Sequence, residues 1–142
     1  MSLGYSVILQ PDDNDTILVT SRDLPRVLTY GGTREEALHH AIDAIETAIA
    51  SMIDDEVDVP APQTKQRGDF VSLPLLSAFK IQLYRELRAA RISRSELARR
   101  LGWDREQVDS LFRIDDASPV DQIEAAFRAL DRDITIEVES AA

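Results

Sequence analysis

Cysteine is missing from all 142 residues of the chain. Its absence excludes disulfide scaffolds, zinc sites built on thiolates, and cysteine nucleophiles. No apolar run approaches the roughly 18 residues that a membrane-spanning helix needs. The opening segment, MSLGYSVILQ, lacks the basic start and the apolar core of a signal peptide. We therefore expect a cytoplasmic protein with no membrane partner.

The residue patterns of common active sites are also missing. The turn at Gly31–Thr33 lacks the glycine and lysine pattern of a phosphate-binding loop. His39 and His40 are neighbours on a predicted helix, so they point about 100° apart and cannot chelate one ion together. Carboxylates fall mostly in predicted turns, whereas two-metal catalysis needs them to converge from different strands. The sequence therefore predicts no enzyme activity, no metal site and no cofactor.

Charge is distributed unevenly along the chain. The net charge is −10, and hydrophobic residues make up 44% of the sequence, as in a folded globular protein. Residues 1–66 contain 4 basic and 12 acidic residues, a balance of −8. Residues 80–113 contain 9 basic and 5 acidic residues, a balance of +4. This difference suggests two functions with partners of opposite charge.

The N-terminal part has the patterns of a small α+β unit. Thr33 and Glu36 form a capping box, which predicts a helix beginning after Thr33 and running to about Asp54. Apolar residues at steps of three and four give this helix one buried face. β-rich runs and turn signals predict strands around the helix, at residues 5–9, 16–20, 27–30 and 70–73.

The C-terminal part is predicted to be helical. Pro60 and Pro62 mark a linker, and Pro74 fits the first turn of a helix. Further helices are expected to begin near Arg94, Arg105 and Pro119. We therefore predict an α+β unit over residues 1–73, followed by an all-α unit over residues 74–142 that ends in a strand.

The segment from Ser93 to Arg113 indicates a helix-turn-helix motif. Two capping boxes, Ser93 with Glu96 and Asp104 with Gln107, would begin its two helices. Gly102 stands where the turn needs a left-handed residue. The spacing from Ala98 through Gly102 to Val108 is that of a DNA-binding helix-turn-helix, and "ELARRLG" resembles the Cro and phage-repressor type. The alternative is a helical hairpin with ordinary caps and no role in DNA binding.

Eight residues of this motif are candidates for contact with operator DNA. Conventional docking brings the start of the second helix to the major groove, where Arg105 and Arg113 could read a base. Glu106 and Asp109 would repel phosphates there unless each pairs with an arginine or accepts from cytosine N4. Each arginine could equally be a solvated surface residue. The eight are Arg94, Arg99 and Arg100, expected at phosphates, and Arg105, Glu106, Asp109, Ser110 and Arg113.

Segments spread over most of the chain form a family pattern by their order and spacing. They are YSVIL at residues 5–9, DLP at 23–25, GTREEA at 32–37, AIE at 44–46, and the prolines at 60 and 62. With these segments, the chain resembles the HicB antitoxin family. The resemblance implies a degenerate ribonuclease-H-like β-β-β-α-β domain without catalysis, which covers a small basic ribonuclease toxin, HicA. It also implies a DNA-binding half, and one of the two HicB variants carries a helix-turn-helix there.

Two further sets of residues follow from this interpretation. Acidic clusters suit a basic toxin, although each cluster could also be a solvated loop. They are Asp12, Asp13, Asp15, Asp23, Asp54, Asp55 and Glu56. Ile134, Ile136 and Val138 alternate as in a strand, which we expect to pair with a second copy and form a dimer. For the tail, the alternatives are an intrachain strand and a frayed end. For the whole protein, the alternative is a free-standing regulator whose N-terminal domain senses a ligand or mediates assembly.

Overall fold

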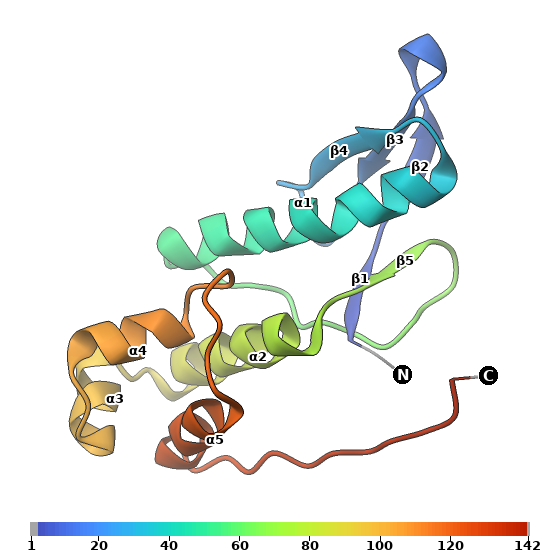
Figure 1. Ribbon diagram of the computed structural model, residues 1–142. Coiled ribbons are helices and arrows are strands. Elements are labelled where there is room, and N and C mark those ends of the chain that lie inside the picture. Colours follow the sequence, from blue (N-terminus) through green and yellow to red (C-terminus); the bar gives the residue numbers. More distant parts are fainter. Residues whose placement is uncertain (1–2, 142) are drawn as a thin grey trace.

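A computed structural model describes residues 3–141 (Figure 1). The mixed α and β character expected from the sequence is confirmed. Among residues 3–141, none of the helices combines the length and apolar character needed to span a bilayer. The elements are β1 (Gly4–Ser6), β2 (Ile8–Pro11), the 3-10 helix η1 (Asp13–Asp15), β3 (Ile17–Thr20), β4 (Leu28–Gly31), α1 (Arg34–Asp54), β5 (Phe70–Ser72), α2 (Leu75–Ala90), α3 (Arg94–Leu101), α4 (Arg105–Leu111) and α5 (Val120–Ala129).

The strands form two small antiparallel sheets. β2, β3 and β4 lie in that order, and β1 pairs with β5. The hairpin predicted between the first two runs is confirmed as β2 and β3. The single strand expected over residues 5–9 is divided at Val7, whose amide donates to the carbonyl of Asp69 at 3.0 Å. The returning strand predicted at 70–73 is confirmed as β5, and it pairs with β1.

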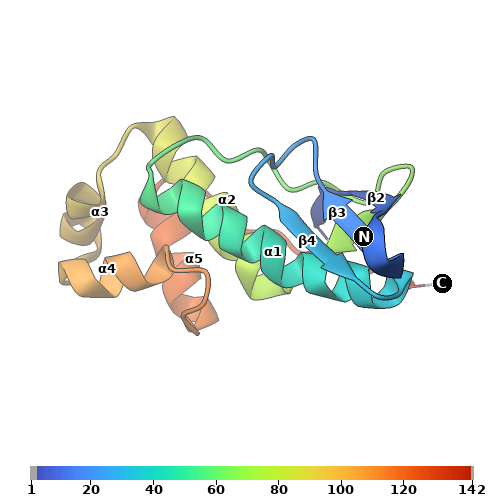
Figure 2. The same cartoon turned by 90° about the horizontal axis from the view of Figure 1, so that it is seen from above.

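α1 covers one face of the three-stranded sheet (Figure 2). Thr33 caps the helix by accepting a hydrogen bond from the amide of Glu36 at 3.1 Å, as the sequence predicts. The buried stripe of α1 includes Ala37, Ala41 and Ile45. At Gly31 a Cβ atom would lie 2.4 Å from the Ala37 amide nitrogen, so the close approach of β4 to α1 requires glycine.

α2 packs against the N-terminal part, and one core cluster includes residues from both parts. The Tyr84 hydroxyl donates to the carbonyl of Val57 at 2.8 Å, and Arg85 donates to that of Val59 at 2.6 Å. The Tyr5 hydroxyl donates to the carbonyl of Pro60 at 2.7 Å. The first proline of the predicted linker is therefore held against β1, and the exposed stretch after it covers residues 63–68.

The strand predicted at the end of the chain does not form within this chain. Residues 131–141 contain no strand, and Ile136 and Val138 are exposed. Ile134 alone of the predicted strand residues packs against the core. None of the described strands takes this segment as a neighbour, so the single chain provides no partner with which it could form a strand. Pairing with a second copy stays a prediction.

Candidate functional site

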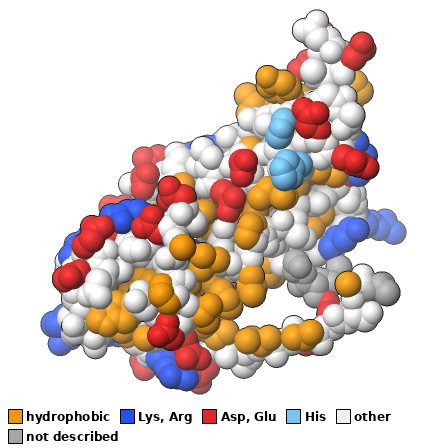
Figure 3. Space-filling model, viewed as in Figure 1, with side chains coloured by type: hydrophobic (Ala, Val, Ile, Leu, Met, Phe, Trp, Pro, Cys, Tyr) orange, Lys and Arg blue, Asp and Glu red, His pale blue; other side chains and the backbone are white. Residues whose placement is uncertain are grey.

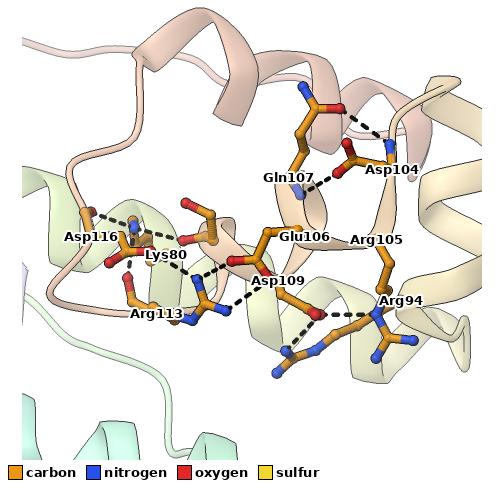
Figure 4. Close-up of polar contacts among 10 residues, drawn as sticks. Lys80, Arg94, Asp104, Arg105, Glu106, Gln107, Asp109, Arg113 and Asp116 are labelled. Atoms are coloured by element: carbon orange, nitrogen blue, oxygen red, sulfur yellow. Dashed lines mark hydrogen bonds and ion pairs between the residues drawn. The ribbon is translucent and has the colours of Figure 1, made fainter.

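The helix pair α3 and α4 has the caps and turn that the sequence predicts. Ser93 Oγ accepts from the amide of Glu96 at 3.0 Å and caps α3. Gly102 ends α3 in the left-handed region, with φ of 69°. Asp104 and Gln107 exchange hydrogen bonds of 2.9 and 3.1 Å and form a complete capping box at the start of α4 (Figure 4). These hydrogen bonds satisfy backbone amides in the first turn of each helix.

Apolar side chains hold the two helices together. Leu97 and Ala98 of α3 are buried, and Val108 and Leu111 of α4 are buried with them. The opposite faces of both helices are exposed and carry arginine and carboxylate side chains. The interior of the pair is thus an ordinary hydrophobic core, and its outer side is free to meet a polar partner.

Lys80 of α2 is a buried cation at the end of α4. Its side chain has no exposed surface, and its Nζ donates to the carbonyls of Ser110, Arg113 and Asp116 at 3.1, 2.6 and 2.6 Å. Desolvation lowers the pKa of Lys80, and the nearby Asp116 acts in the opposite direction. The contacts satisfy carbonyls at the C-terminal end of α4, where a helix favours positive charge. Lys80 therefore fixes α4 against α2.

Sequence reasoning missed the role of Lys80. In the sequence, Lys80 stands out only as one of the nine basic residues between positions 80 and 113. Lys80 lies four residues after Leu76 and three before Leu83, so it falls on the apolar face of α2. A lysine on that face must find hydrogen-bond acceptors inside the protein. The position of Lys80 on the apolar face is therefore the sequence feature that could have predicted its buried contacts.

Asp109 of α4 is shared between two arginines. Arg94 donates to its Oδ1 at 3.2 Å, and Arg105 donates to the same atom at 2.9 Å (Figure 4). Burial acts to raise the pKa of Asp109, but hydrogen bonds from Arg105 and Arg94 outweigh it, so the pKa is lowered. The Arg94 guanidinium also lies over the Phe112 ring, 4.8 Å from its centroid. Asp109 is therefore a stable anion between two cations.

The other arginines of the motif are paired in the same way. Arg113 contacts Glu106 at 2.8 Å and Asp116 at 3.3 Å, and hydrogen bonds to these carboxylates raise its pKa. Glu96 accepts from both Arg99 and Arg100. These two hydrogen bonds, the one from Arg99 the stronger, lower the pKa of Glu96 to about 2.

The structure brings all eight predicted DNA-contacting residues into one region. They lie on α3, on α4 and in the turn after it. Arg105 and Arg99 are exposed, whereas Ser110 is half-buried and its carbonyl accepts from Lys80. Arg100 is also tied to α5 through the carbonyl of Ala129, at 3.0 Å. Glu106 and Asp109 are each paired with arginine, which is one of the two arrangements that the sequence left open for them.

The acidic residues predicted to meet a toxin form two separate groups. Asp12, Asp13 and Asp15 lie at the tip of the β2–β3 hairpin, which projects from the end of the molecule where α1 begins (Figure 1). Asp54, Asp55 and Glu56 lie at the other end of α1, which has 21 residues and is therefore about 30 Å long. Asp23 belongs to the turn after β3, and Arg26 of that turn pairs with Asp55 at 2.7 Å. The seven residues cannot form one compact cluster.

The exposed side of α1 is acidic. Figure 3 shows carboxylates spread along this helix and the hairpin, with two histidines between them. The exposed acidic residues include Glu35, Glu36 and Asp43, and His39 and His40 are exposed beside them. Among the described side chains, no three His, Cys, Asp or Glu residues group closely enough to hold a metal ion. The surface is suited to a basic partner through electrostatic steering.

Comparison with known proteins identifies the family. A family model for the HicB-like antitoxin of bacterial toxin–antitoxin systems matches residues 4–82. The chain is 37% identical over 132 residues to a protein named antitoxin HicB from Pseudomonas fluorescens, which covers 92% of this chain and 90% of that protein. It is 32% identical over 135 residues to antitoxin HicB from Escherichia coli, covering 94% and 98%. Antitoxin HicB 1 from Photorhabdus laumondii is 30% identical over 138 residues, covering 97% and 88%. The chain therefore belongs to the HicB-like family of antitoxins of bacterial toxin–antitoxin systems.

Proposed function

We propose that this protein is a non-enzymatic cytoplasmic antitoxin that binds and neutralises a small basic ribonuclease of the HicA type. Membership of the HicB-like family carries the proposal, because the family match over residues 4–82 includes the whole acidic N-terminal part. The acidic surface of α1 and of the β2–β3 hairpin supports it. Such a surface accelerates encounter with a basic protein and disfavours acidic ones.

The same protein binds operator DNA through α3 and α4 and represses its own operon. The caps, the left-handed Gly102 and the buried Ala98 and Val108 support a helix-turn-helix. α4 would lie in the major groove, with Arg105 and Arg113 toward base edges and the arginines of α3 toward phosphates. Because these arginines are paired with Asp109, Glu106 and Glu96, binding must exchange internal carboxylates for phosphates.

A homodimer places two such helix pairs on one operator. Ile134, Ile136 and Val138 of the tail are the proposed contact, since Ile136 and Val138 are exposed in the single chain. Two tails that pair as strands would satisfy each other's backbone groups. The two-fold axis would then set both α4 helices about one turn of DNA apart, ~34 Å.

Two assays test this function. Co-expression with a HicA-type toxin is expected to restore growth, and a catalytically inactive toxin provides the control for expression. Titration of a duplex from the promoter of the chain's own gene is expected to give tighter binding than a scrambled duplex, by about a thousandfold or more. Growth arrest that persists at full antitoxin expression contradicts neutralisation. Equal affinity for both duplexes contradicts operator recognition.

A further inference from the structure

Glu106 and Asp109, two carboxylates of α4, are held in different ways. The Asp109 side chain is 23% exposed and accepts from Arg94 and Arg105, so it is turned toward α3 (Figure 4). The Glu106 side chain is 73% exposed and pairs with Arg113, which follows the end of α4. This pair therefore lies along the exposed side of α4. Glu106 is the carboxylate that the helix presents to a partner.

The ion pair between Glu106 and Arg113 is open to exchange. Arg113 donates from its two Nη atoms to the two carboxylate oxygens of Glu106, at 2.8 and 3.2 Å. Exposed ion pairs of this kind contribute little to stability. Arg113 also contacts Asp116 at 3.3 Å, so it keeps one carboxylate partner when it releases the other. A DNA phosphate that draws Arg113 away leaves Glu106 as an unpaired acceptor.

A carboxylate in the major groove needs a hydrogen-bond donor, because it only accepts when it is ionised. Guanine presents O6 and N7 to the groove and thymine presents O4, and all three atoms are acceptors. The donors are N4 of cytosine and N6 of adenine, and the adenine donor lies beside the acceptor N7. Cytosine is therefore the base whose edge suits a carboxylate best.

Arg105 provides the complementary donor. It precedes Glu106 in the first turn of α4, and its side chain is 54% exposed. A guanidinium group donates to O6 and N7 of guanine, which is the partner of cytosine in a base pair. The start of α4 thus carries a donor and an acceptor next to each other, which fits a stretch of groove that contains both bases.

We propose that Glu106 determines the sequence specificity of operator binding by accepting a hydrogen bond from N4 of a cytosine. The inference rests on the proposed function and names a residue that selects bases within the operator. An unpaired carboxylate disfavours the other bases and also non-specific contact with phosphates, so it lowers overall affinity and raises selectivity. Asp109, which stays between Arg94 and Arg105, instead lowers affinity for every sequence alike.

The test measures base preference at each position of the operator. The probes are duplexes in which every base pair of the promoter of the chain's own gene is replaced in turn, and binding of the full-length chain is followed by fluorescence anisotropy. The unaltered chain is expected to bind about tenfold more weakly when one particular cytosine is replaced. Glu106→Gln is expected to prefer adenine at that position, because glutamine pairs with N6 and N7 of adenine. Other positions should keep their preferences.

Two further variants separate base reading from the loss of charge. Glu106→Ala removes the acceptor, so the preference at that position should disappear while binding to a scrambled duplex tightens several-fold. Glu124→Gln is the matched control, since Glu124 of α5 is also a partly exposed carboxylate paired with an arginine, Arg128, at 3.5 Å. It should leave the base preferences unchanged. Thermal unfolding checks that each variant is folded.

The outcomes separate the residue from the function. If the unaltered chain distinguishes promoter from scrambled DNA and Glu106→Gln keeps the same preference at every position, Glu106 does not read a base and operator binding stands. Loss of preference at all positions in a folded Glu106→Gln would make Glu106 a residue that positions α4, which also overturns the proposal. If the unaltered chain binds both duplexes equally, operator binding fails and this inference fails with it.

Discussion

Replacing Asp109 by asparagine is expected to tighten binding to DNA. Asp109 holds Arg94 and Arg105 by hydrogen bonds of 3.2 and 2.9 Å, and it lies on the helix proposed to enter the major groove. Asparagine has nearly the same shape and keeps a carbonyl oxygen that both arginines can reach. The change therefore removes one negative charge near phosphates and weakens the hydrogen bonds that hold the two guanidinium groups.

The size of the effect follows from the charges involved. Two unit charges about 7 Å apart interact by about 0.6 kcal/mol in water and about 2.4 kcal/mol at an effective dielectric constant of 20. A gain of about 1–2 kcal/mol, or about 5- to 30-fold in affinity, is therefore expected. Each additional phosphate contact should steepen the slope of log K against log salt by about 0.9. The lost ion pairs are partly exposed, so the free energy of unfolding should fall by only about 1 kcal/mol.

Fluorescence anisotropy with promoter and scrambled duplexes at two salt concentrations measures this change. Asp43→Asn, an exposed position on α1, is the matched control because it alters the net charge equally in the other part of the chain. We expect tighter binding to both duplexes for Asp109→Asn and no change for the control. Unchanged or weaker binding by Asp109→Asn would refute the proposed docking of α4.

Three further predictions concern the rest of the C-terminal part. Lys80→Met leaves the carbonyls of Ser110, Arg113 and Asp116 without their donor, so the free energy of unfolding in urea should fall by about 2–4 kcal/mol; an unchanged midpoint would show that water replaces the ammonium. The pKa of Glu96 is lowered from 4.5 to about 2, so its ion pairs stabilise α3 above pH 4.5 and are lost as the pH falls through 2; a carboxyl NMR titration centred near 4.5 would contradict these pairs. Deleting residues 133–142 should halve the mass measured by light scattering, whereas an unchanged oligomer would place the dimer contact elsewhere.

Local patterns predicted most of the helices. Thr33, Ser93 and Asp104 cap helices as expected, because a capping side chain acts on amides only two or three residues away. Gly102 adopts the left-handed conformation for the same local reason. Strands were predicted less well, since the division at Val7 depends on pairing with the distant Asp69 and the tail lacks an intrachain partner.

The chemistry of the site depended on contacts between distant residues. The sequence left open whether Glu106 and Asp109 pair with arginine or accept from cytosine, and only the packing of α3 on α4 brings Arg94 to Asp109. The same limit applies to Lys80, whose acceptors lie about 30 residues further along the chain. The exposure of Leu28 and Tyr30 on β4 also required the strand register, because both look like ordinary core residues in the sequence.

The central claim is that this chain captures a small basic toxin through its acidic N-terminal part. Native mass spectrometry of the chain purified after co-expression with an inactive HicA-type toxin tests it most directly. The account predicts a complex whose mass includes the toxin and which is stable at physiological salt. Recovery of the antitoxin chain without the toxin under the same conditions would contradict the account.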